Sequence, residues 1–397
     1  MGWDLASLLW PLEVSTFLEQ YWTRRAIAIA GEDPARFAPL FSWASLNHVL
    51  NYQSLHFPTD GRLVRDGQSL PIASPQATIA ALQQGATLII NGLHGRDPAL
   101  AALAAALRDG VGHRVQINSY CTPAQQQGFD CHYDTHEVIV LQLDGAKEWF
   151  VFEPSAIAPT EATRSPDDVP PDAPSYLKTV LQPGDVLYVP RGHWHYAMAC
   201  GDRPSFHLTI GIDCETGLDW LAWLMEQLAQ RPQWRENLPL VPLGDDRALR
   251  GAVRVLGAAL AAELQSEVGM EALAQAYGHA LASGARSPEP FQLPQQLGQD
   301  VFPVGLETEF WCPAYPRLRL VAQGDGATQI CVGAQRVTVV GLESAVLAEI
   351  LGRSRFTPWD LADVVPDLDW ETELAPLLRR LVMEGILKVA DAQVPSS

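Results

Sequence analysis

Two hydrophobic periodicities divide the chain. From residue 111 to about 215, apolar and polar residues alternate with a period of two, or β-branched and apolar residues run together, as they do in strands. The predicted strands cover residues 114–118, 137–143, 147–152, 179–182, 186–190 and 206–212. Asp144-Gly145 predicts a hairpin between the second and third of these strands. Many short strands with regular turns indicate a sandwich or barrel of the jelly-roll type.

Helical patterns flank this strand-rich region. Before it, residues 1–110 mix helix and short strand signals. An Ala/Leu run over residues 99–107 follows Asp97-Pro98 and stops at Asp109-Gly110, which are the start and stop signals of a helix. After it, apolar residues recur at helical spacing over residues 218–228, 247–264 and 268–281.

The last block of the chain combines strand and helix patterns. Residues 287–299 are rich in Pro and Gln and predict a linker. Strands are expected over residues 317–321, 329–332 and 336–340, then helical segments over 342–351 and 359–364, a helix ending near Glu384-Gly385, and a strand over 386–389. The order of the later elements is winged-helix-like.

These patterns predict an α+β protein with three domains, as a length of 397 residues also suggests. The division expected is residues 1–215 for the jelly roll with its N-terminal helical region, 216–290 for a helical segment, and 291–397 for the winged-helix-like domain. The helices of the middle segment are short and apolar, so we expect them to bury that face against a second copy of the chain, as a homodimer. Packing against their own jelly roll is the alternative.

The net charge restricts the partners. It is 27 − 46 = −19, and it is spread evenly, with −10 over residues 1–215 and −9 over residues 216–397. The segment from Leu342 onward, which would contact DNA if the winged-helix-like domain bound it, has a net charge of 5 − 10 = −5. Phosphate contacts need basic residues, so we expect no direct nucleic-acid binding. A basic protein partner fits the charge, as does a merely solvated acidic surface.

Neither a membrane nor an oxidising compartment is indicated. No apolar run reaches the ~18 residues of a membrane span, and the first residues lack the basic start of a signal peptide. The six cysteines contain no C-x-x-C pair, so we expect reduced thiols and a cytoplasmic protein. Residues 154–174 hold six prolines among acidic and small residues, which predicts an exposed and often functional loop.

The candidate chemistry lies in a His-x-Asp pair. On a strand, residues i and i+2 face the same side, so His132 and Asp134 can reach one point. A second histidine, His195, follows a strand, a Pro-Gly-Asp turn, another strand and a Pro-Arg-Gly turn about sixty residues later. Two imidazoles and one carboxylate form the set that holds Fe(II) and leaves positions open for oxygen and a cosubstrate. His-x-Asp alone is a weak motif, but the combination is specific.

Two further histidines are possible alternatives for the metal. His136 shares the face of His132 and Asp134 but lies farther along, so we favour a supporting role for it. His193 lies two residues before His195, and we favour a turn position near solvent.

Several segments together carry a family resemblance. They are Asn118-Ser119-Tyr120, 126–129, 132–136, 141–149 and 190–195, with 21–25 and 40–43 nearer the start. They resemble the JmjC-type ribosomal oxygenases, which are cupin-fold protein hydroxylases that depend on Fe(II) and 2-oxoglutarate. The resemblance is strong over residues 1–215. Beyond them it is one of architecture, where the family has a helical dimerisation segment and a winged-helix end.

The resemblance implies a role for each matching residue. His132, Asp134 and His195 match the iron ligands. Lys147, one of only three lysines, matches the residue that pairs with the distal carboxylate of 2-oxoglutarate, and a buried ammonium needs such an anion. The remaining matches are Thr209, for the hydroxyl that supports this carboxylate, and Asn118 and Tyr120, which line the site near the target side chain.

The sequence also departs from the family. Gly211 stands where histidine-hydroxylating members have a serine, and the loop 154–174 has no match, so the target residue stays open. We expect a dioxygenase that uses Fe(II), 2-oxoglutarate and O2 to hydroxylate a side chain of a basic protein such as a ribosomal protein. The alternatives are the same chemistry on a natural-product peptide or a small molecule, a demethylase or non-oxidative cupin, and a cupin/winged-helix regulator without enzymatic activity.

Overall fold

The protein is represented by a computed structural model. It describes residues 2–165, 167–241, 245–284, 291–312, 318–323, 326–332, 335–353, 355–361, 365–366 and 368–390. The chain divides into two compact units, residues 1–273 and 274–397, and each is described by itself. No helix in the described part of the chain is long and apolar enough to cross a membrane.

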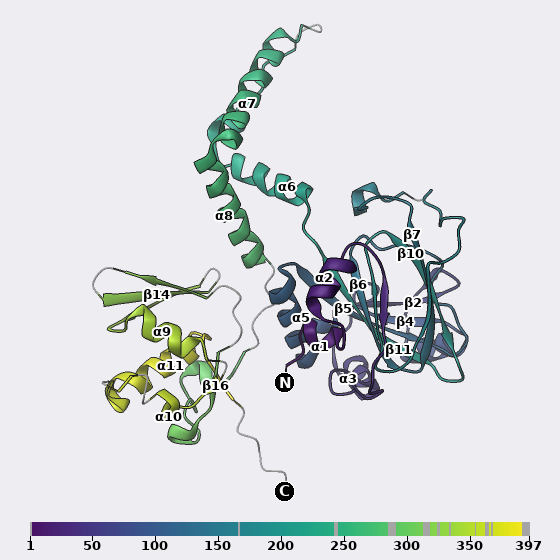
Figure 1. Cartoon of the computed structure of the whole chain (residues 1–397), viewed down its shortest axis with the longest axis horizontal. Coiled ribbons are helices and arrows are strands. Elements are labelled where there is room, and N and C mark those ends of the chain that lie inside the picture. The colour runs from purple at the N-terminus through teal and green to yellow at the C-terminus, as the bar shows by residue number, and fades with distance from the viewer. Residues whose placement is uncertain are drawn as a thin grey trace. The chain divides into compact units, whose positions relative to one another are not determined.

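Two antiparallel sheets form the centre of the first unit (Figure 1). The predicted strand region supplies β5 (Arg114–Thr122), β6 (Glu137–Asp144), β7 (Ala146–Pro154), β8 (Leu177–Leu181), β9 (Val186–Val189), β10 (His193–Cys200) and β11 (Ser205–Asp213). The larger sheet has the order β1-β9-β6-β11-β5-β4-β2-β3 and the smaller one β10-β7-β8. This is the jelly roll that the alternating pattern predicts.

The N-terminal region extends and covers the larger sheet (Figure 1). Its elements are α1 (Leu5–Leu9), α2 (Val14–Gln20), β1 (Ile27–Ile29), α3 (Trp43–Tyr52), β2 (Gly61–Arg65), β3 (Gln68–Leu70), α4 (Pro75–Gln83), β4 (Thr87–Ile90) and α5 (Pro98–Val111). Leu8, Phe17 and Leu103 from these helices join Ile139 and Ile210 of the sheet in one buried apolar cluster. The helices therefore seal one face of the larger sheet.

The other face of the larger sheet lines the interior between the sheets. Because side chains alternate along a strand, Val138 and Val140 of β6 point away from Ile139 and join Trp149 and Val151 of β7 in a second buried cluster. Polar side chains take the remaining interior positions, and they form the candidate site described below.

The predicted hairpin at Asp144-Gly145 is wrong. β6 pairs with β9 and β11, whereas β7 pairs with β8 and β10, so the chain crosses from one sheet to the other at this turn. Gly145 has φ +62°, and a Cβ there would lie 2.1 Å from the carbonyl oxygen of Pro204. The turn residues are correctly read, but they do not reveal which strand becomes the partner.

The predicted stop of α5 also shifts. The Asp97 side chain caps the helix by accepting from the N–H groups of Ala99 and Leu100, as expected. The helix continues through Gly110 and ends at Val111, where Gly112 forms the C-cap in the left-handed conformation (φ +73°).

The three predicted helices after the jelly roll are present. They are α6 (Gly217–Leu228), α7 (Arg247–Gln265) and α8 (Glu267–Gly284). Their shared core is small: among the side chains that the structure describes in these helices, the buried apolar ones are Leu224, Leu228 and Leu273, which are 3%, 8% and 9% exposed. On α6 the apolar side chains of Leu218, Leu221 and Met225 stay exposed.

The second unit has its own apolar core and two small sheets. Its elements are β12 (Phe310–Trp311), β13 (Arg319–Ala322), β14 (Ala327–Val332), β15 (Gln335–Val340), α9 (Ser344–Leu351), β16 (Arg355–Phe356), α10 (Pro358–Leu361), α11 (Ala375–Met383) and β17 (Lys388–Val389). The sheets have the orders β13-β14-β15 and β16-β12-β17. Part of the predicted linker 287–299 and the end of the predicted segment 359–364 lie outside the described residues.

The crossover at Gly145 gives a testable prediction for stability. Gly145→Ala should lower the free energy of unfolding by about 2 kcal/mol or more, because it combines a positive φ with a backbone clash. Gly201→Ala is the matched control, since Gly201 also has a positive φ (+86°) but open space around it. Urea unfolding of both variants measures the difference, and equal losses would contradict the account.

Candidate active site

The sequence-predicted metal ligands come together. One ligand atom each from His132, Asp134 and His195 lies within 4.8 Å of the others, and the described residues hold no other such group. The sequence predicts a strand around His132. In the structure this segment is irregular and pairs with β10 through an isolated bridge. The His132 N–H donates to the His195 carbonyl at 3.0 Å, and the His195 N–H donates to the His132 carbonyl at 2.7 Å.

Backbone carbonyls fix how both imidazoles are turned. The Nδ1 atom of His132 lies 2.8 Å from the Asp130 carbonyl oxygen, and that of His195 lies 3.0 Å from the His193 carbonyl oxygen. A carbonyl can only accept, so Nδ1 carries the proton and each Nε2 keeps a lone pair for a metal. The Nε2 atom of His195 lies 3.5 Å from Asp134 Oδ2, which puts the lone pair beside the carboxylate.

The electrostatics favour a neutral imidazole beside an anionic carboxylate. Burial, with a contribution from the neighbouring His132, lowers the pKa of His195 to about 4. Burial alone would raise the pKa of Asp134, but the surrounding histidines and Arg164 outweigh it and bring that pKa below its usual value. Two neutral imidazoles and a carboxylate are the donor set that suits Fe(II).

Lys147 is buried in the interior without an anionic partner. Its side chain on β7 is 4% exposed, and its Nζ donates to Thr122 Oγ1 at 3.2 Å. Burial lowers the pKa of the ammonium to about 7. In the described part of the chain no carboxylate forms an ion pair with it, and a buried ammonium needs an anion for compensation. The site therefore fits a ligand that carries a carboxylate.

Several polar atoms around Lys147 have no hydrogen-bond partner. They are Gln142 Oε1, Trp149 Nε1 and His207 Nδ1, all buried. His207 stacks on Tyr120 with 5.0 Å between ring centroids, and its ring lies 5.8 Å from that of Trp149. Buried polar groups are normally satisfied, so this unpaired set supports a polar ligand in the interior.

Asn118, Tyr120 and Thr209 lie on the same interior face. Asn118 is the register partner of Thr209, and Tyr120 that of His207. Burial and the charge of Asp134 raise the pKa of Tyr120 to about 12, so its phenol stays protonated near the metal ligands. The Asn118 side-chain oxygen is used by the fold, because it accepts from the Gly92 N–H at 2.9 Å.

Thr122 is a further residue of the site that the sequence motifs do not predict. This residue, not Thr209, provides the hydroxyl that Lys147 contacts. A signal was available, because Thr122 continues the alternate positions of Asn118 and Tyr120 along β5.

The two alternative histidines lie beside the cluster, not in it. His193 is buried, and its Nδ1 is 2.8 Å from the Tyr176 hydroxyl, so it is not the solvent-near histidine we favour from sequence. His136 packs against Gly211, where an added Cβ would lie 2.8 Å from the imidazole Cδ2. A serine at position 211 would therefore collide with the His136 imidazole as it is placed in this structure.

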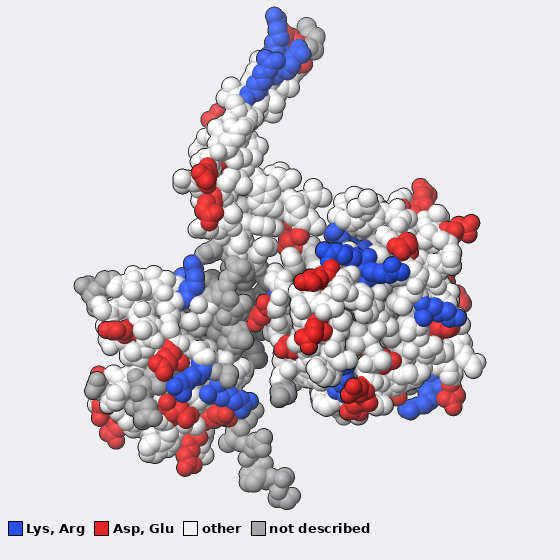
Figure 2. All heavy atoms as spheres, in the orientation of Figure 1, with Lys and Arg blue, Asp and Glu red and all other residues white. Residues whose placement is uncertain are grey.

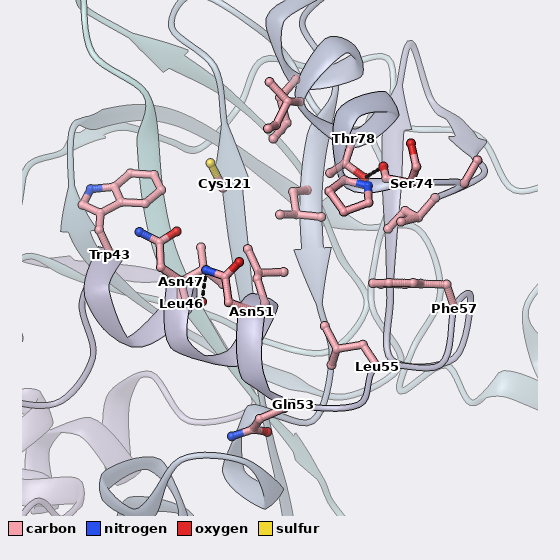
Figure 3. A pocket seen from close by; sticks show the side chains of 17 residues that line it. Trp43, Leu46, Asn47, Asn51, Gln53, Leu55, Phe57, Ser74, Thr78 and Cys121 are labelled. Atoms are coloured by element: carbon pink, nitrogen blue, oxygen red, sulfur yellow. Dashed lines mark hydrogen bonds between the residues drawn. The ribbon is translucent and has the colours of Figure 1, made fainter.

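A separate pocket lies behind β5 (Figure 3). It has a volume of about 560 Å³ and lies between α3, α4 and the larger sheet. Trp43, Asn47, Asn51 and Cys121 line it, and no charged residue does. Cys121 alternates with Tyr120 and Thr122, so this pocket is on the helix-covered face and not at the metal cluster.

Comparisons with known proteins agree with this fold. The JmjC domain family matches residues 99–219. Ribosomal oxygenase 1 of Rattus norvegicus is 34% identical over 212 residues, which are 51% of this chain and 36% of the relative. The bifunctional lysine-specific demethylase and histidyl-hydroxylase NO66 of Drosophila persimilis is 30% identical over 253 residues, or 59% of this chain and 36% of the relative. The chain thus spans about a third of the length of these curated relatives.

A solved structure matches almost the whole chain. The Escherichia coli ribosomal oxygenase YcfD aligns with a TM-score of 0.55 and 18% identity over 98% of this chain and 100% of that one. Its complex with cobalt and 2-oxoglutarate aligns with a TM-score of 0.56 and 17% identity, over 96% and 99%. Residues 99–219 of this chain are therefore similar to the JmjC domain family, and the chain shares the overall fold of these solved structures. Its sequence is similar to that of the curated ribosomal oxygenases, as its motifs predict.

The burial of Lys147 gives a prediction with a defined pH dependence. The folded-state pKa of about 7 lies below the unfolded value of 10.5, so burial of the charge costs stability in full below pH 7. Between pH 7 and 10.5 the cost shrinks, because only the unfolded chain still binds the proton. Lys147→Met should therefore raise the Tm most at pH 6, and the gain should narrow towards pH 10.

Thermal unfolding of the metal-free protein across this pH range measures the effect. Lys178→Met is the control, because Lys178 is exposed and pairs with Glu148 at 3.2 Å. A pH-independent gain, or the same gain in the control, would contradict a buried charge at Lys147.

Proposed function

We propose that this protein is an Fe(II)- and 2-oxoglutarate-dependent dioxygenase that hydroxylates an amino-acid side chain of a protein. The observation that carries the proposal is the pairing of a two-histidine, one-carboxylate cluster with a buried lysine that has no anionic partner. The YcfD complex with cobalt and 2-oxoglutarate supports it. Some relatives are named demethylases as well as hydroxylases, and that activity would use the same site.

Each residue has a role in this proposal. His132 and His195 would bind Fe(II) through Nε2 and Asp134 through a carboxylate oxygen. The Lys147 ammonium and the Thr122 hydroxyl would hold the distal carboxylate of 2-oxoglutarate, which then supplies the missing anion. When bound, Fe(II) with 2-oxoglutarate and O2 would supply the oxidant for a C–H bond of the target, with one oxygen atom going to the new C–OH group and the other to succinate as CO2 leaves. The surrounding rings of Tyr120, Trp149 and His207 would keep bulk water out of this chemistry.

The target side chain would lie beside Asn118 and Tyr120. The protonated Tyr120 hydroxyl can donate a hydrogen bond there, and the Asn118 amide nitrogen is available because its oxygen is already used. Thr209, the register partner of Asn118, stays the predicted additional hydroxyl for the distal carboxylate of 2-oxoglutarate. His136 packs against Gly211 on the same interior face, so the target residue could differ from that of relatives with serine at this position.

The substrate class follows from charge. The net charge of −19 suits a basic protein, and a ribosomal protein is the first candidate given the names of the relatives. Figure 2 shows acidic side chains scattered over both units on the face drawn. The six cysteines form no disulfide in the described part of the chain, which is consistent with a cytoplasmic protein.

The second unit is proposed to be a winged-helix-like scaffold that faces a protein. Its order of α9, β16, α10, α11 and β17 resembles a winged helix. The net charge of −5 from Leu342 onward disfavours DNA, and with it the regulator alternative.

A homodimer through the helical segment completes the proposal. Leu218, Leu221 and Met225 are three or four residues apart along α6 and remain 61%, 47% and 66% exposed. Leu224 and Leu228 lie on the adjoining side of the same helix and are buried against the neighbouring helices, whereas these three side chains stay exposed. An exposed apolar stripe of this kind is commonly buried against the same stripe of a second copy of the chain, related by a two-fold axis.

The proposed activity can be tested by comparing the wild type with Asp134→Ala and Lys147→Met. The wild type with Fe(II), 2-oxoglutarate and a mixture of basic ribosomal proteins should produce succinate and add 16 Da to a substrate protein. Asp134→Ala should abolish both. Lys147→Met should raise the 2-oxoglutarate requirement about tenfold or more, because a charge-assisted bond is worth roughly 1.5–3 kcal/mol. Full succinate production by Asp134→Ala would refute the ligand assignment.

The dimer prediction concerns the exposed stripe of α6. Light scattering on the full chain at micromolar concentration should give twice the chain mass of 43.4 kDa. Leu221→Glu should shift the protein towards the monomer, because it places a charge in an apolar interface. Ile79→Glu changes an equally exposed apolar residue elsewhere and should leave the dimer intact. A monomeric wild type would exclude the dimer.

A further inference from the structure

The proline-rich loop between β7 and β8 contacts the segment that carries the metal ligands. From this loop, residues 154–174, the Asp168 carboxylate accepts a hydrogen bond from the Tyr133 hydroxyl. Arg164 donates to the Tyr133 carbonyl at 3.2 Å, and its guanidinium lies 5.4 Å from the centre of the Tyr133 ring. Glu161 accepts from the Thr135 hydroxyl at 3.3 Å. The contacted residues alternate with His132 and Asp134.

The same loop holds the second ligand-bearing segment. Trp194 lies between His193 and His195, and its indole N–H donates to the Ser155 hydroxyl at 2.9 Å. Pro159 packs against Gly192 so closely that a Cβ on Gly192 would lie 2.8 Å from its Cδ. Gly192 in turn donates to the Asp134 carbonyl at 2.9 Å. One loop therefore reaches both parts of the metal cluster.

Tyr133 and Trp194 connect these two contacts. Their rings meet edge to face, with 5.0 Å between centroids, and they are only 3% and 4% exposed. Each aromatic is hydrogen-bonded to the loop through its polar atom, so the loop and the ligand-bearing segments pack together. Aromatic pairs of this geometry add stability beyond the area that they bury.

The ligand segment needs such support. His132 and Asp134 lie outside any regular strand, and the bridge between His132 and His195 provides their pairing to the sheet. A segment with few constraints must be ordered when a metal binds, and that entropy loss weakens binding. Proline restricts the unbound loop itself, which makes it suited to hold a neighbour in place.

We propose that loop 154–174 is a brace that positions the metal-binding segments, with Tyr133 and Asp168 as its main positioning pair. This inference rests on the proposed metal site and concerns residues outside the His132, Asp134 and His195 cluster. Ser165 fixes the acceptor by donating its N–H to Asp168 at 2.9 Å. The brace raises metal affinity by preorganising His132 and Asp134 from behind.

Cobalt(II) binding to the full-length apoprotein tests the brace without any turnover. The dissociation constant is measured by competition with a chromogenic chelator, and the visible spectrum of the saturated protein reports the ligand arrangement. Asp168→Ala and Tyr133→Phe should each weaken Co(II) binding about tenfold, the lower end of what supporting residues contribute. Because both changes break one contact, the double variant should lose no more than the larger single loss.

Two matched variants separate positioning from charge and from folding. Asp168→Asn keeps an acceptor for the Tyr133 hydroxyl and should retain most of the affinity. Asp172→Ala removes an exposed carboxylate of the same loop and should bind Co(II) like the wild type. Tyr133→Phe removes only one oxygen atom, so it remains informative if Asp168→Ala does not fold.

Three results would contradict the brace, and each of them has a different cause. If Tyr133→Phe and Asp168→Ala lower the Tm but leave the Co(II) affinity and spectrum unchanged, the loop is only structural and the brace is wrong. Equal losses in Asp172→Ala and Asp168→Ala would mean that charge, not positioning, sets the affinity, and would also overturn it. A wild-type protein that binds no Co(II) would overturn the proposed function together with this inference.

Discussion

Two backbone hydrogen bonds between His132 and His195 are the constraint on which the site depends. They join an irregular segment to the start of β10, although the two residues are about sixty positions apart in the chain. The jelly roll brings the two residues together, because β6 and β7 lie in different sheets and the chain then returns to the larger sheet as β9. Everything proposed for the centre, from its metal to its cosubstrate, requires that these two short stretches stay in register.

Part of the interior between the sheets, beside the apolar cluster of Val138, Val140 and Val151, is polar where an ordinary sandwich would be apolar. Lys147, Thr122 and His207 are buried there, and three polar atoms nearby lack partners. Such an interior costs stability in the empty protein, since a buried ammonium loses its hydration. A dicarboxylate held beside a divalent cation offsets that cost, so the same feature that strains the apoprotein favours the proposed ligands. The apolar cluster around Leu8, Phe17 and Leu103, on the far face of the larger sheet, provides the stability that the site does not.

The sequence predicts the parts of this arrangement that repeat with a short period. Alternation locates the strands, and the spacing of His132, Asp134 and His195 predicts a cluster that the structure brings together. The partner of a strand depends on contacts far along the chain, so Asp144-Gly145 looks like a hairpin and is a crossover. Thr122 shares the periodicity of Tyr120, but its role becomes visible only in the structure, where the Lys147 ammonium donates to its hydroxyl. The attachment of loop 154–174 to Tyr133 and Trp194 is likewise invisible in the sequence, because no periodic pattern encodes a loop contact.

The central claim is that one site binds Fe(II) and 2-oxoglutarate together. Its most direct test is an anaerobic titration of the full-length apoprotein followed by visible absorption, because 2-oxoglutarate chelated to Fe(II) gives a charge-transfer band. The account predicts a band that needs protein, Fe(II) and 2-oxoglutarate together, saturates at one equivalent per chain, and requires far more 2-oxoglutarate in Lys147→Met. If the wild type binds Fe(II) but 2-oxoglutarate produces no band, or if Lys147→Met titrates like the wild type, the proposed site is wrong.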